Sequence, residues 1–559
     1  MAQIKSKTLF FTTSPRSPMK MIPEIELLAQ HFSGKSWNKD NQIKFIELLA
    51  TDEHFEGVGS QGDLAFSARD RINRAPKALG FIDLKPSICL TDAGKIFVEG
   101  KRKDEALLRQ LLKFQLPSPF HTSDDDEFWI KPYLEILRLI SVLGKITFDE
   151  LMIFGLQLTN YNKFDEIVSH ILEFRKAKES FKGKYKALCN EVFNRELEKI
   201  YESEILQGNT STRESADSSI DKFKKTKRSN MRDYTDACFR YLRATGLVAI
   251  SYKGKSLSIM ADKVNDVAFI LENTERNPIF VNDERSYKNY LFNANTPVLY
   301  SDSRDNLIAY IISHSALSIE QLDHKSIDEL KDIRDDIIQK TKDSIIADQV
   351  RELKSYHLFN DVINTYNEII ANDIYDVPLM LEWNTWRAMT MLDGGNITGN
   401  FKVDDNGQPL STAIGNTPDI VCDYDDFGLT VEVTMQSGQR QYEMEGEPVA
   451  RHLAKHKKST NKEVFCLFIA PHINEACIAH FFTLSKTNIS YYGGKSIIVP
   501  LPLETFIGMV KRSYAAPFTP TPRHIKELFE FAKSEANKDI DEQQWYSNIQ
   551  QKAMNWLVA

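Results

Sequence analysis

The segment Asn416-Thr-Pro-Asp-Ile-Val-Cys-Asp-Tyr-Asp-Asp-Phe-Gly-Leu-Thr-Val-Glu-Val-Thr434 decides how the C-terminal third of the chain folds. An extended run follows Asp419, a polar turn covers residues 423–428, and β-branched residues return over 429–434, which predicts a β-hairpin. Glu432 lies inside the returning apolar strand, where a buried carboxylate is costly unless a cation pairs with it. Mg²⁺ prefers oxygen ligands and takes one or two protein carboxylates. The hairpin therefore predicts a divalent-cation site, against the alternative of a turn Asp and a solvent-facing Glu.

Further carboxylates flank this hairpin on both sides. Residues 435–452 read as a polar loop that enters a helix, and this helix carries Glu443, Glu445 and Glu447. Upstream, the stretch Leu381-Glu-Trp-Asn-Thr-Trp386 places Glu382 between aromatic residues on an expected helix. Two carboxylates on one hairpin, with others on the neighbouring helices, are the layout of a PD-(D/E)xK-type nuclease centre.

Taken together, these motifs resemble the AlwI-like family of type IIS restriction endonucleases and related site-specific nicking endonucleases. The C-terminal likeness lies in "LEWNTW", "GNTPDI", "VEVT" and "QYEMEGEPVARH". The N-terminal likeness lies in "SPRSP" (residues 14–18) and "AFSARDRINRAPKALGF" (residues 65–81), so the resemblance spans most of the chain. It implies four catalytic residues, Glu382, Asp419, Glu432 and Glu445, and a metal-holding set of Asp419, Glu432 and Val433.

One position departs from the general nuclease pattern, because Thr434 stands two residues after Glu432 where many such enzymes have Lys. The resemblance suggests a variant centre in which Glu445 or Gln441 of the next helix takes part, and the group that activates water stays open. His452 and His456 lie four apart on the same expected helix. They lack a third ligand at metal spacing, so the lysines around them favour a phosphate-facing surface over a zinc site.

Length and composition indicate a globular protein of several domains. The chain has 559 residues, of which 42% are hydrophobic and 26% charged, enough for two to four separate cores. No apolar run reaches the length of a membrane span, which predicts a cytoplasmic protein. The six cysteines form no C-x-x-C pair, which argues against a disulfide framework and against structural zinc.

The formal net charge of −8 at first opposes nucleic acid as a partner. Net charge governs non-specific attraction, however, and a site-specific protein can gather its cations on one face. Two basic clusters occur, one over residues 69–77 and one over residues 222–232, although such runs are more often solvated loops than binding surfaces. The predicted DNA-binding residues are Arg16, Arg69, Arg71, Arg74, Lys77, Lys225, Lys227, Arg228 and Arg232.

One local pattern occurs twice in the first half of the chain. A helix over residues 69–79 leads through Gly80 into two strands, and a helix over residues 231–244 leads through Gly246 into two more. Helix, glycine cap, strand, turn and strand is the winged-helix order. Between the copies, Thr147 and Glu150 predict a capping box at the start of a further helix. The alternative is an ordinary helix packed on a hairpin, and the basic residues of both helices favour DNA reading.

These patterns predict a multidomain α+β protein. A first winged-helix-like DNA-recognition module is expected over residues 1–118 and a second over 119–305. Residues 306–374 are an expected helical linker, because apolar residues recur there at helical spacing. Residues 375–559 are expected to form the PD-(D/E)xK-type α/β nuclease domain.

The predicted function is type IIS cleavage of double-stranded DNA, in which Mg²⁺-dependent hydrolysis occurs at a fixed distance from a short asymmetric site. Expected partners are DNA, a transient homodimer on DNA or a small partner subunit, and a cognate DNA methyltransferase of the same restriction-modification system. A strand-specific nicking enzyme or the large subunit of a heterodimer would carry the same residues. The alternative from another class is a non-catalytic winged-helix regulator.

Overall fold

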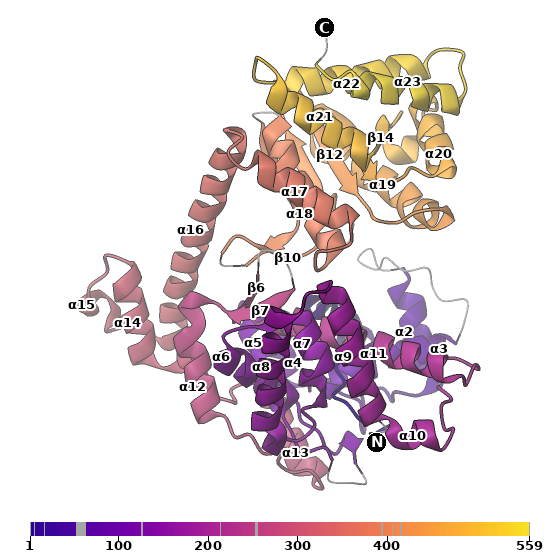
Figure 1. Ribbon diagram of the computed structural model, residues 1–559. Coiled ribbons are helices and arrows are strands. Elements are labelled where there is room, and N and C mark those ends of the chain that lie inside the picture. The colour runs from indigo at the N-terminus through magenta and orange to yellow at the C-terminus, as the bar shows by residue number, and fades with distance from the viewer. Residues whose placement is uncertain are drawn as a thin grey trace. The chain divides into compact units, whose positions relative to one another are not determined.

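The computed structural model describes residues 2–557 except 5, 16, 52–62, 124–126, 213, 252–254, 393–394, 405 and 414–415. It divides into two compact units, Met1–Ile337 and Ile338–Ala559 (Figure 1). Both helices and sheets are present, so the predicted mixed α+β class is confirmed. Within the described ranges, no helix combines the length and apolar character needed to cross a membrane.

The first part of unit 1 is a group of helices followed by a hairpin. Its elements are β1 (Ala2–Gln3), η1 (Pro18–Lys20), α1 (Met21–Phe32), α2 (Lys39–Leu49), α3 (Leu64–Ala78), β2 (Ile82–Asp83), β3 (Cys89–Leu90), α4 (Asp92–Glu99) and α5 (Lys103–Lys113). Helices α1 to α3 and the hairpin enclose one apolar core that includes Phe45 and Ile72. Gly80 ends α3 in the left-handed region at φ 76°, where an added Cβ would meet Leu291 Cγ at 2.4 Å. The predicted order of helix, glycine and hairpin is therefore present.

The second part of unit 1 repeats this order around a longer helix. Its elements are β4 (His121–Thr122), α6 (Pro132–Leu143), β5 (Ile146–Thr147), α7 (Phe148–Ile153), η2 (Gly155–Gln157), η3 (Tyr161–Lys163), α8 (Phe164–Ser180), α9 (Tyr185–Ile200), α10 (Glu202–Leu206), α11 (Ile220–Arg243), β6 (Val248–Ile250) and β7 (Ser256–Ile259). The predicted capping box is confirmed at α7, where Glu150 N donates to Thr147 Oγ1 at 3.1 Å. Strand β5 joins the hairpin in a sheet of order β5-β7-β6.

Helix α11 begins eleven residues earlier than predicted, so the basic cluster of residues 222–232 is helical rather than a solvated loop. The N-cap is Ser219, whose side chain accepts from Lys222 N, and the helix buries Phe223, Met231 and Phe239. Lysines separate the apolar positions of residues 222–232, so in the sequence this segment resembles a solvated loop. The N-terminal strand β1 pairs in parallel with β4, which attaches the start of the chain to this second group.

The remainder of unit 1 is helical and ends inside a long helix. Its elements are η4 (Ala261–Lys263), α12 (Val264–Asn273), α13 (Glu284–Phe292), η5 (Tyr300–Asp302), α14 (Arg304–His314), α15 (Ile319–Leu322) and the first part of α16 (Ile327–Lys354). Leu330 of α16 is fully buried against Leu307, Ile311 and Leu322. The boundary between the two units falls between Ile337 and Ile338, inside α16. The stretch predicted as a helical linker is helical, and its division from the modules before it stays a prediction.

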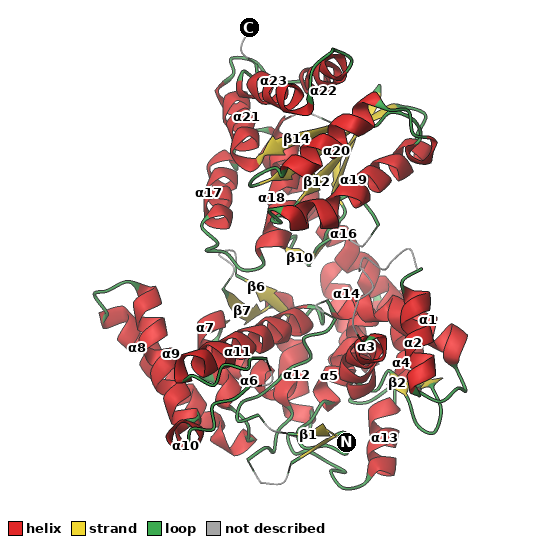
Figure 2. Cartoon of the chain, turned by 90° about the vertical axis from the view of Figure 1, so that its right-hand side faces the viewer, coloured by secondary structure: helices red, strands yellow, loops and turns green. Residues whose placement is uncertain are grey.

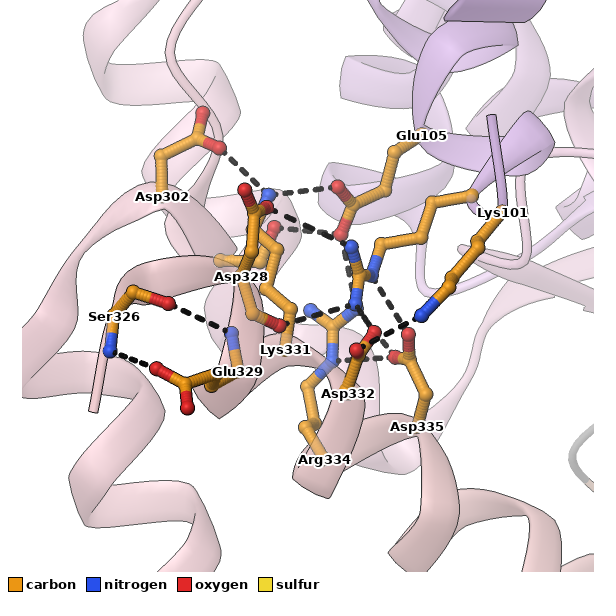
Figure 3. A network of polar contacts seen from close by, with 12 residues as sticks. Lys101, Glu105, Asp302, Ser326, Asp328, Glu329, Lys331, Asp332, Arg334 and Asp335 are labelled. Atoms are coloured by element: carbon orange, nitrogen blue, oxygen red, sulfur yellow. Dashed lines mark hydrogen bonds and ion pairs between the residues drawn. The ribbon is translucent and has the colours of Figure 1, made fainter. Parts of the chain in front are cut away.

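Charged side chains attach the first turns of α16 to α5 (Figure 3). Lys331 Nζ lies 2.9 Å from Glu105 Oε2 and 2.8 Å from Asp302 Oδ1, and Arg334 donates to Glu105 Oε1 at 2.9 Å. The side chains of Glu105 and Arg334 are each 15% exposed, so solvent screens these pairs less than it screens surface pairs. The network therefore joins the start of α16 to α5.

Unit 2 is built on a five-stranded mixed sheet of order β14-β13-β12-β11-β8. Its elements are α17 (Phe359–Ile370), α18 (Val377–Leu392), β8 (Asn396–Gly399), β9 (Lys402–Val403), β10 (Pro409–Ser411), β11 (Ile420–Asp423), β12 (Phe427–Val433), α19 (Gln439–Ser459), β13 (Glu463–Ala470), α20 (Glu475–Lys486), η6 (Ser490–Tyr492), β14 (Ile498–Pro502), α21 (Leu503–Ala515), α22 (Pro522–Ala536) and α23 (Glu542–Met554). The predicted hairpin is confirmed, since β11 and β12 pair antiparallel with Ile420 opposite Val431.

Helices cover both faces of this sheet (Figure 2). Strands β12, β13 and β14 run parallel, so the right-handed crossovers α19 and α20 lie on the same face. Helices α18 and α21 pack on the other face. Strands β12 and β13 are consequently buried on both sides and read as continuous apolar runs. A charged side chain inside β12 must therefore find its partner within the protein.

Glu105 gives a test of the network around α16. Burial opposes ionisation of its carboxyl, but Arg334 and Lys331 outweigh burial and lower the pKa of Glu105 to about 2. A lowered pKa stabilises the folded state above the pKa of the unfolded chain, and this contribution is lost as pH falls from about 4.5 toward 2. At pH 7, we expect Glu105→Gln to lower the free energy of the local unfolding that exposes the backbone amides of α5 by about 2 kcal/mol. In acid, the difference in this free energy between the variant and wild type should shrink.

Hydrogen exchange of the full chain at pH 7 and pH 3 measures both effects. Asp328→Asn is the control, because this side chain is 92% exposed and lies 3.8 Å from Arg102 in the same network. Exposed pairs of this kind contribute little, so its exchange should match wild type. If the α5 amides of Glu105→Gln and wild type were equally protected from hydrogen exchange at pH 7, the network would not hold the start of α16 to α5.

Candidate active site

The hairpin β11–β12 places two carboxylates at one edge of the sheet in unit 2. Asp419 directly precedes β11, and Glu432 lies one residue before the end of β12, so antiparallel pairing sets them opposite each other. The backbone confirms the approach, because Val433 N donates to Asp419 Oδ2 at 2.8 Å. Asp419 is half-buried, whereas Glu432 is only 6% exposed. The structure thus brings together the three residues predicted to hold metal.

Glu432 has a partner that the sequence interpretation missed. His452 of α19 lies with Nδ1 2.9 Å from Glu432 Oε1, and the two side chains are 7% and 8% exposed. The lysine-rich surroundings favoured a phosphate-facing surface for His452, but the helix turns it inward onto the sheet. His456, one turn later, approaches Gly428 of the same strand. The signal present in the sequence was the spacing of Gln441, Glu445 and His452, which share one helical face.

The loop that enters β11 is fixed by contacts from two other elements. Asn400, just after β8, donates from its backbone to Asp419 O at 2.9 Å and from its side chain to Pro418 O at 2.6 Å. On the other side, Arg451 of α19 donates to the side chain of Asn416. Asn416 adopts φ 66°, a left-handed conformation that Asn tolerates better than most residues. Asp419 therefore has a defined position although its side chain reaches solvent.

The remaining carboxylates implied by the family resemblance lie on the flanking helices. Glu382 is 7% exposed on α18, and its Oε2 accepts from Ala413 N at 3.0 Å, in the segment that leads toward Asp419. Glu445 is half-buried on α19, two turns before His452 on the same face, and its charge helps to raise the pKa of Cys477, after burial. Glu443 is exposed on a different face. Catalytic roles for Glu382 and Glu445 stay predictions.

Thr434, at the position where Lys was expected, serves the backbone. It is 8% exposed, its amide donates to Ile469 O at 3.0 Å, and its Oγ1 accepts from Gln436 N at 3.1 Å. Gln441 plays a similar part, since its amide group donates to Gln436 O and His472 O at 2.9 and 2.8 Å. Both residues shape the loop between β12 and α19.

The donor set at this edge suits a hard divalent cation. Asp419 and Glu432 supply the one or two carboxylates that Mg²⁺ usually takes from a protein, and Val433 can add only its backbone carbonyl oxygen. Burial first, and then the charges of Glu432 and Asp419, raise the pKa of Cys466 well above its ordinary value. The site thus offers oxygen donors and a concentration of negative charge, so the residues fit the metal.

The basic residues predicted on α3 are engaged with neighbours in unit 1. Arg71 pairs with Glu24, Arg74 lies 2.6 Å from Asp70, and Arg69 donates to Gln42 at 2.9 Å. Lys77 lies over the ring of Phe120 at 4.7 Å, and burial lowers its pKa. The side chains of Arg69 and Arg74 are each 41% exposed and can still reach outward. Arg16 lies outside the described residues.

The basic residues of α11 divide into two kinds. Arg228 packs over the ring of Phe193 at 4.7 Å, and Lys227 lies over Tyr201 at 4.7 Å, so both help to hold α9, α10 and α11 together. Lys225 and Arg232 are exposed, seven residues apart on one face. Of this cluster, those two are the better placed for an external partner, and DNA binding by any of these residues stays a prediction.

The comparisons with known proteins place this architecture in a family. Residues 77–509 match the model of the AlwI restriction endonuclease family, so the chain belongs to that family. Membership implies DNA nuclease activity and DNA as a partner. A solved structure, the small subunit (R.BspD6I2) of the heterodimeric restriction endonuclease R.BspD6I, is 26% identical over 34% of this chain and 98% of its own, with a TM-score of 0.30. No curated protein sequence matches.

His452 gives the test of this site. Replacing it with Ala removes the contact that orients Glu432, and losing such an orienting partner typically lowers metal affinity or activity by about 10- to 100-fold. We expect His452→Ala to cleave about 10- to 100-fold more slowly than wild type. The variant should also need a higher Mg²⁺ concentration to reach half of its maximal rate. Binding of target DNA should be unchanged, which separates a positioning role from general loss of structure.

His456→Ala is the matched control for this experiment, because it removes an imidazole one turn further along the same helix. It should retain the Mg²⁺ dependence of wild type. If both variants lost activity equally, with unaltered Mg²⁺ dependence, the contact between His452 and Glu432 would have no role in holding metal.

Proposed function

We propose that this protein is a Mg²⁺-dependent, site-specific endonuclease of type IIS, which binds a short asymmetric DNA sequence and cleaves at a fixed distance from it. The observation that carries the proposal is the juxtaposition of Asp419 and Glu432 at one sheet edge, in a chain of a restriction endonuclease family. The edge is formed where parallel strands end, the usual place for a ligand in open α/β sheets. We assign unit 2 the nuclease role, as a PD-(D/E)xK-type domain.

In the proposed reaction, water attacks a DNA phosphodiester and one P–O bond breaks. Asp419, Glu432 and the Val433 carbonyl would hold Mg²⁺, which when bound polarises the phosphate and lowers the pKa of water. Val433 N fixes the Asp419 carboxylate, and His452 fixes that of Glu432. Glu445 lies on the face of α19 that carries His452, where we propose that it completes the site or orients water. Glu382 holds the backbone at Ala413 and is a further proposed catalytic carboxylate.

DNA recognition is assigned to unit 1. Both copies of the helix, glycine and hairpin order lie there, and we interpret them as winged-helix-like modules. Exposed Lys225 and Arg232 on α11, and the half-exposed Arg69 and Arg74 on α3, support contacts to DNA. Base edges would be read by Arg or Asn in the major groove, and phosphates would be held by Lys and backbone amides. A cognate methyltransferase would protect the host site.

Two alternatives remain within reach of direct tests. One carboxylate set cuts one strand at a time, so a nicking enzyme or the large subunit of a heterodimer would have the same site. A non-catalytic winged-helix regulator would lack cleavage altogether. The ordered contacts around Asp419 and Glu432 disfavour the regulator, because a degenerate site has no need to hold two carboxylates together at the cost of their repulsion.

The first test removes one metal-holding carboxylate at a time. Asp419→Asn and Glu432→Gln should each reduce plasmid cleavage by orders of magnitude, since a bound cation contributes several kcal/mol to transition-state stabilisation. Specific DNA binding, measured by gel shift in Ca²⁺, should persist because it resides in unit 1. Asp426→Asn is the control, as this residue lies in the turn between β11 and β12, at the other end of the hairpin, and pairs with Lys526 at 2.6 Å. Cleavage at wild-type rate by the Asp419 variant would overturn the assignment.

The second test decides how many strands are cut. We expect transient pairing of nuclease units on DNA, so nicked plasmid should accumulate at low enzyme concentration and linear plasmid at high concentration. Linear product without a nicked intermediate, at every dilution, would indicate a stable dimer. A reaction that stops at the nick in excess enzyme would identify a nicking enzyme or a subunit that lacks its partner.

A further inference from the structure

Helix α19 leaves part of its own sheet face uncovered. Across one register row of this face, Thr430 of β12 is fully buried, Val421 of β11 is half-buried, and Thr398 of β8 is exposed. Paired residues of neighbouring strands point to the same side, so exposure rises steadily away from α19. In the next row, Asp423 and Asn396 are both exposed. The α19 side of β11 and β8 is therefore half-buried to exposed along these two rows, and this strip of sheet is here called the open strip.

A row of cations lies on the side of α19 from which Arg451 contacts the loop before β11. Arg451, Lys455 and Lys458 follow one another at spacings of four and three, which places them on one face of α19. Lys455 and Lys458 are exposed, and Arg451 is 24% exposed. Over the same half of the helix, this face carries no acidic residue. The row of Arg451, Lys455 and Lys458 is called the α19 cation row.

The α19 cation row begins at the candidate active site. Arg451 donates to Asn416, three residues before Asp419, and its sequence neighbour His452 contacts Glu432. From there α19 packs over β12 and β13, and Lys462, three residues after the helix ends, pairs with Asp423 of β11 at 2.7 Å. The open strip and the cation row therefore share one starting point, the edge with Asp419 and Glu432.

We propose that the open strip and the α19 cation row together seat the backbone of the DNA strand being cut, with phosphates next to the scissile one held by Arg451, Lys455 and Lys458. This inference rests on the proposed function and adds a binding surface in unit 2 that reads no sequence. The row covers seven helical steps, about 10 Å along α19, a length over which a DNA duplex advances by about three base pairs at 3.4 Å each, measured along the duplex axis. A single backbone can therefore follow the row while one phosphate reaches the carboxylates.

The charges around the strip agree with a polyanionic occupant. Glu447, the acidic residue nearest the row on its face, forms an ion pair with Arg451 at 3.1 Å. Asp423 is neutralised by Lys462. The floor offers small or polar side chains, Val421, Thr398 and Asn396, none of which repels phosphate. Cations at a helix C-terminus also stabilise the helix dipole, so a purely structural role for Lys455 and Lys458 is the competing explanation.

The experiment compares two double variants of the full chain in single-turnover cleavage of a target duplex across a salt series. Lys455→Gln with Lys458→Gln should slow cleavage at least 10-fold and flatten the logarithmic salt dependence by about 0.9 for each lost phosphate contact. Lys511→Gln with Lys552→Gln is the control, since these exposed lysines of α21 and α23 lose the same charge elsewhere in unit 2. The control should cleave like wild type, and all variants should bind the target through unit 1.

A second pair of variants tests the floor of the strip. Thr398→Glu adds a carboxylate beside the expected backbone and should slow cleavage, whereas Thr398→Gln adds the same bulk without charge and should not. Wild-type rates and salt dependence in both the lysine double variant and Thr398→Glu would overturn the proposal. A failure of the proposed function would give a different result from a failure of this inference, because wild-type protein would then show no Mg²⁺-dependent cleavage.

Discussion

The carboxylate of Glu432 is the constraint on which unit 2 depends. It lies inside a strand that helices cover on both faces, where an unpaired charge would be costly. His452 meets it from α19 at 2.9 Å, so the helix must cross the sheet in the one register that brings these two side chains together. That register also sets Arg451 against the loop before Asp419. The placement of one buried acid thus determines the position of α19 and the geometry of both carboxylates.

Local patterns in the sequence were enough to predict the hairpin, the capping box at Thr147 and both glycine-ended helices. These features depend on neighbours only a few residues apart, such as the bond between Glu150 N and Thr147 Oγ1. The contact of His452 with Glu432 joins residues twenty positions apart, and helical spacing alone does not say which face of α19 meets the sheet. The basic run in α11 was mistaken for a loop because its buried stripe is thin. The attachment of the start of α16 to α5 depends on long-range pairs such as Glu105 with Lys331.

The acidic net charge is compatible with DNA binding because many basic residues already have structural partners. Arg71 pairs with Glu24, and Arg109 with Asp302, so much of the charge in unit 1 is internally balanced. Exposed cations also stand in short rows, Lys225 with Arg232 on α11 and Lys455 with Lys458 on α19. Such rows create local positive potential without a basic protein overall. Sequence-wide charge therefore says little about where a polyanion binds here.

The absence of a strand lysine shifts the question of water activation to α19. Thr434 is turned toward the backbone, since its hydroxyl accepts from Gln436 N and its amide donates to Ile469 O. A side chain held in this way stabilises the entry to α19. The same helix carries His452 and, two turns earlier on the same face, Glu445. We infer that the polar groups which orient water come from α19, so its register over β12 controls metal binding, water positioning and the seat of the DNA backbone together.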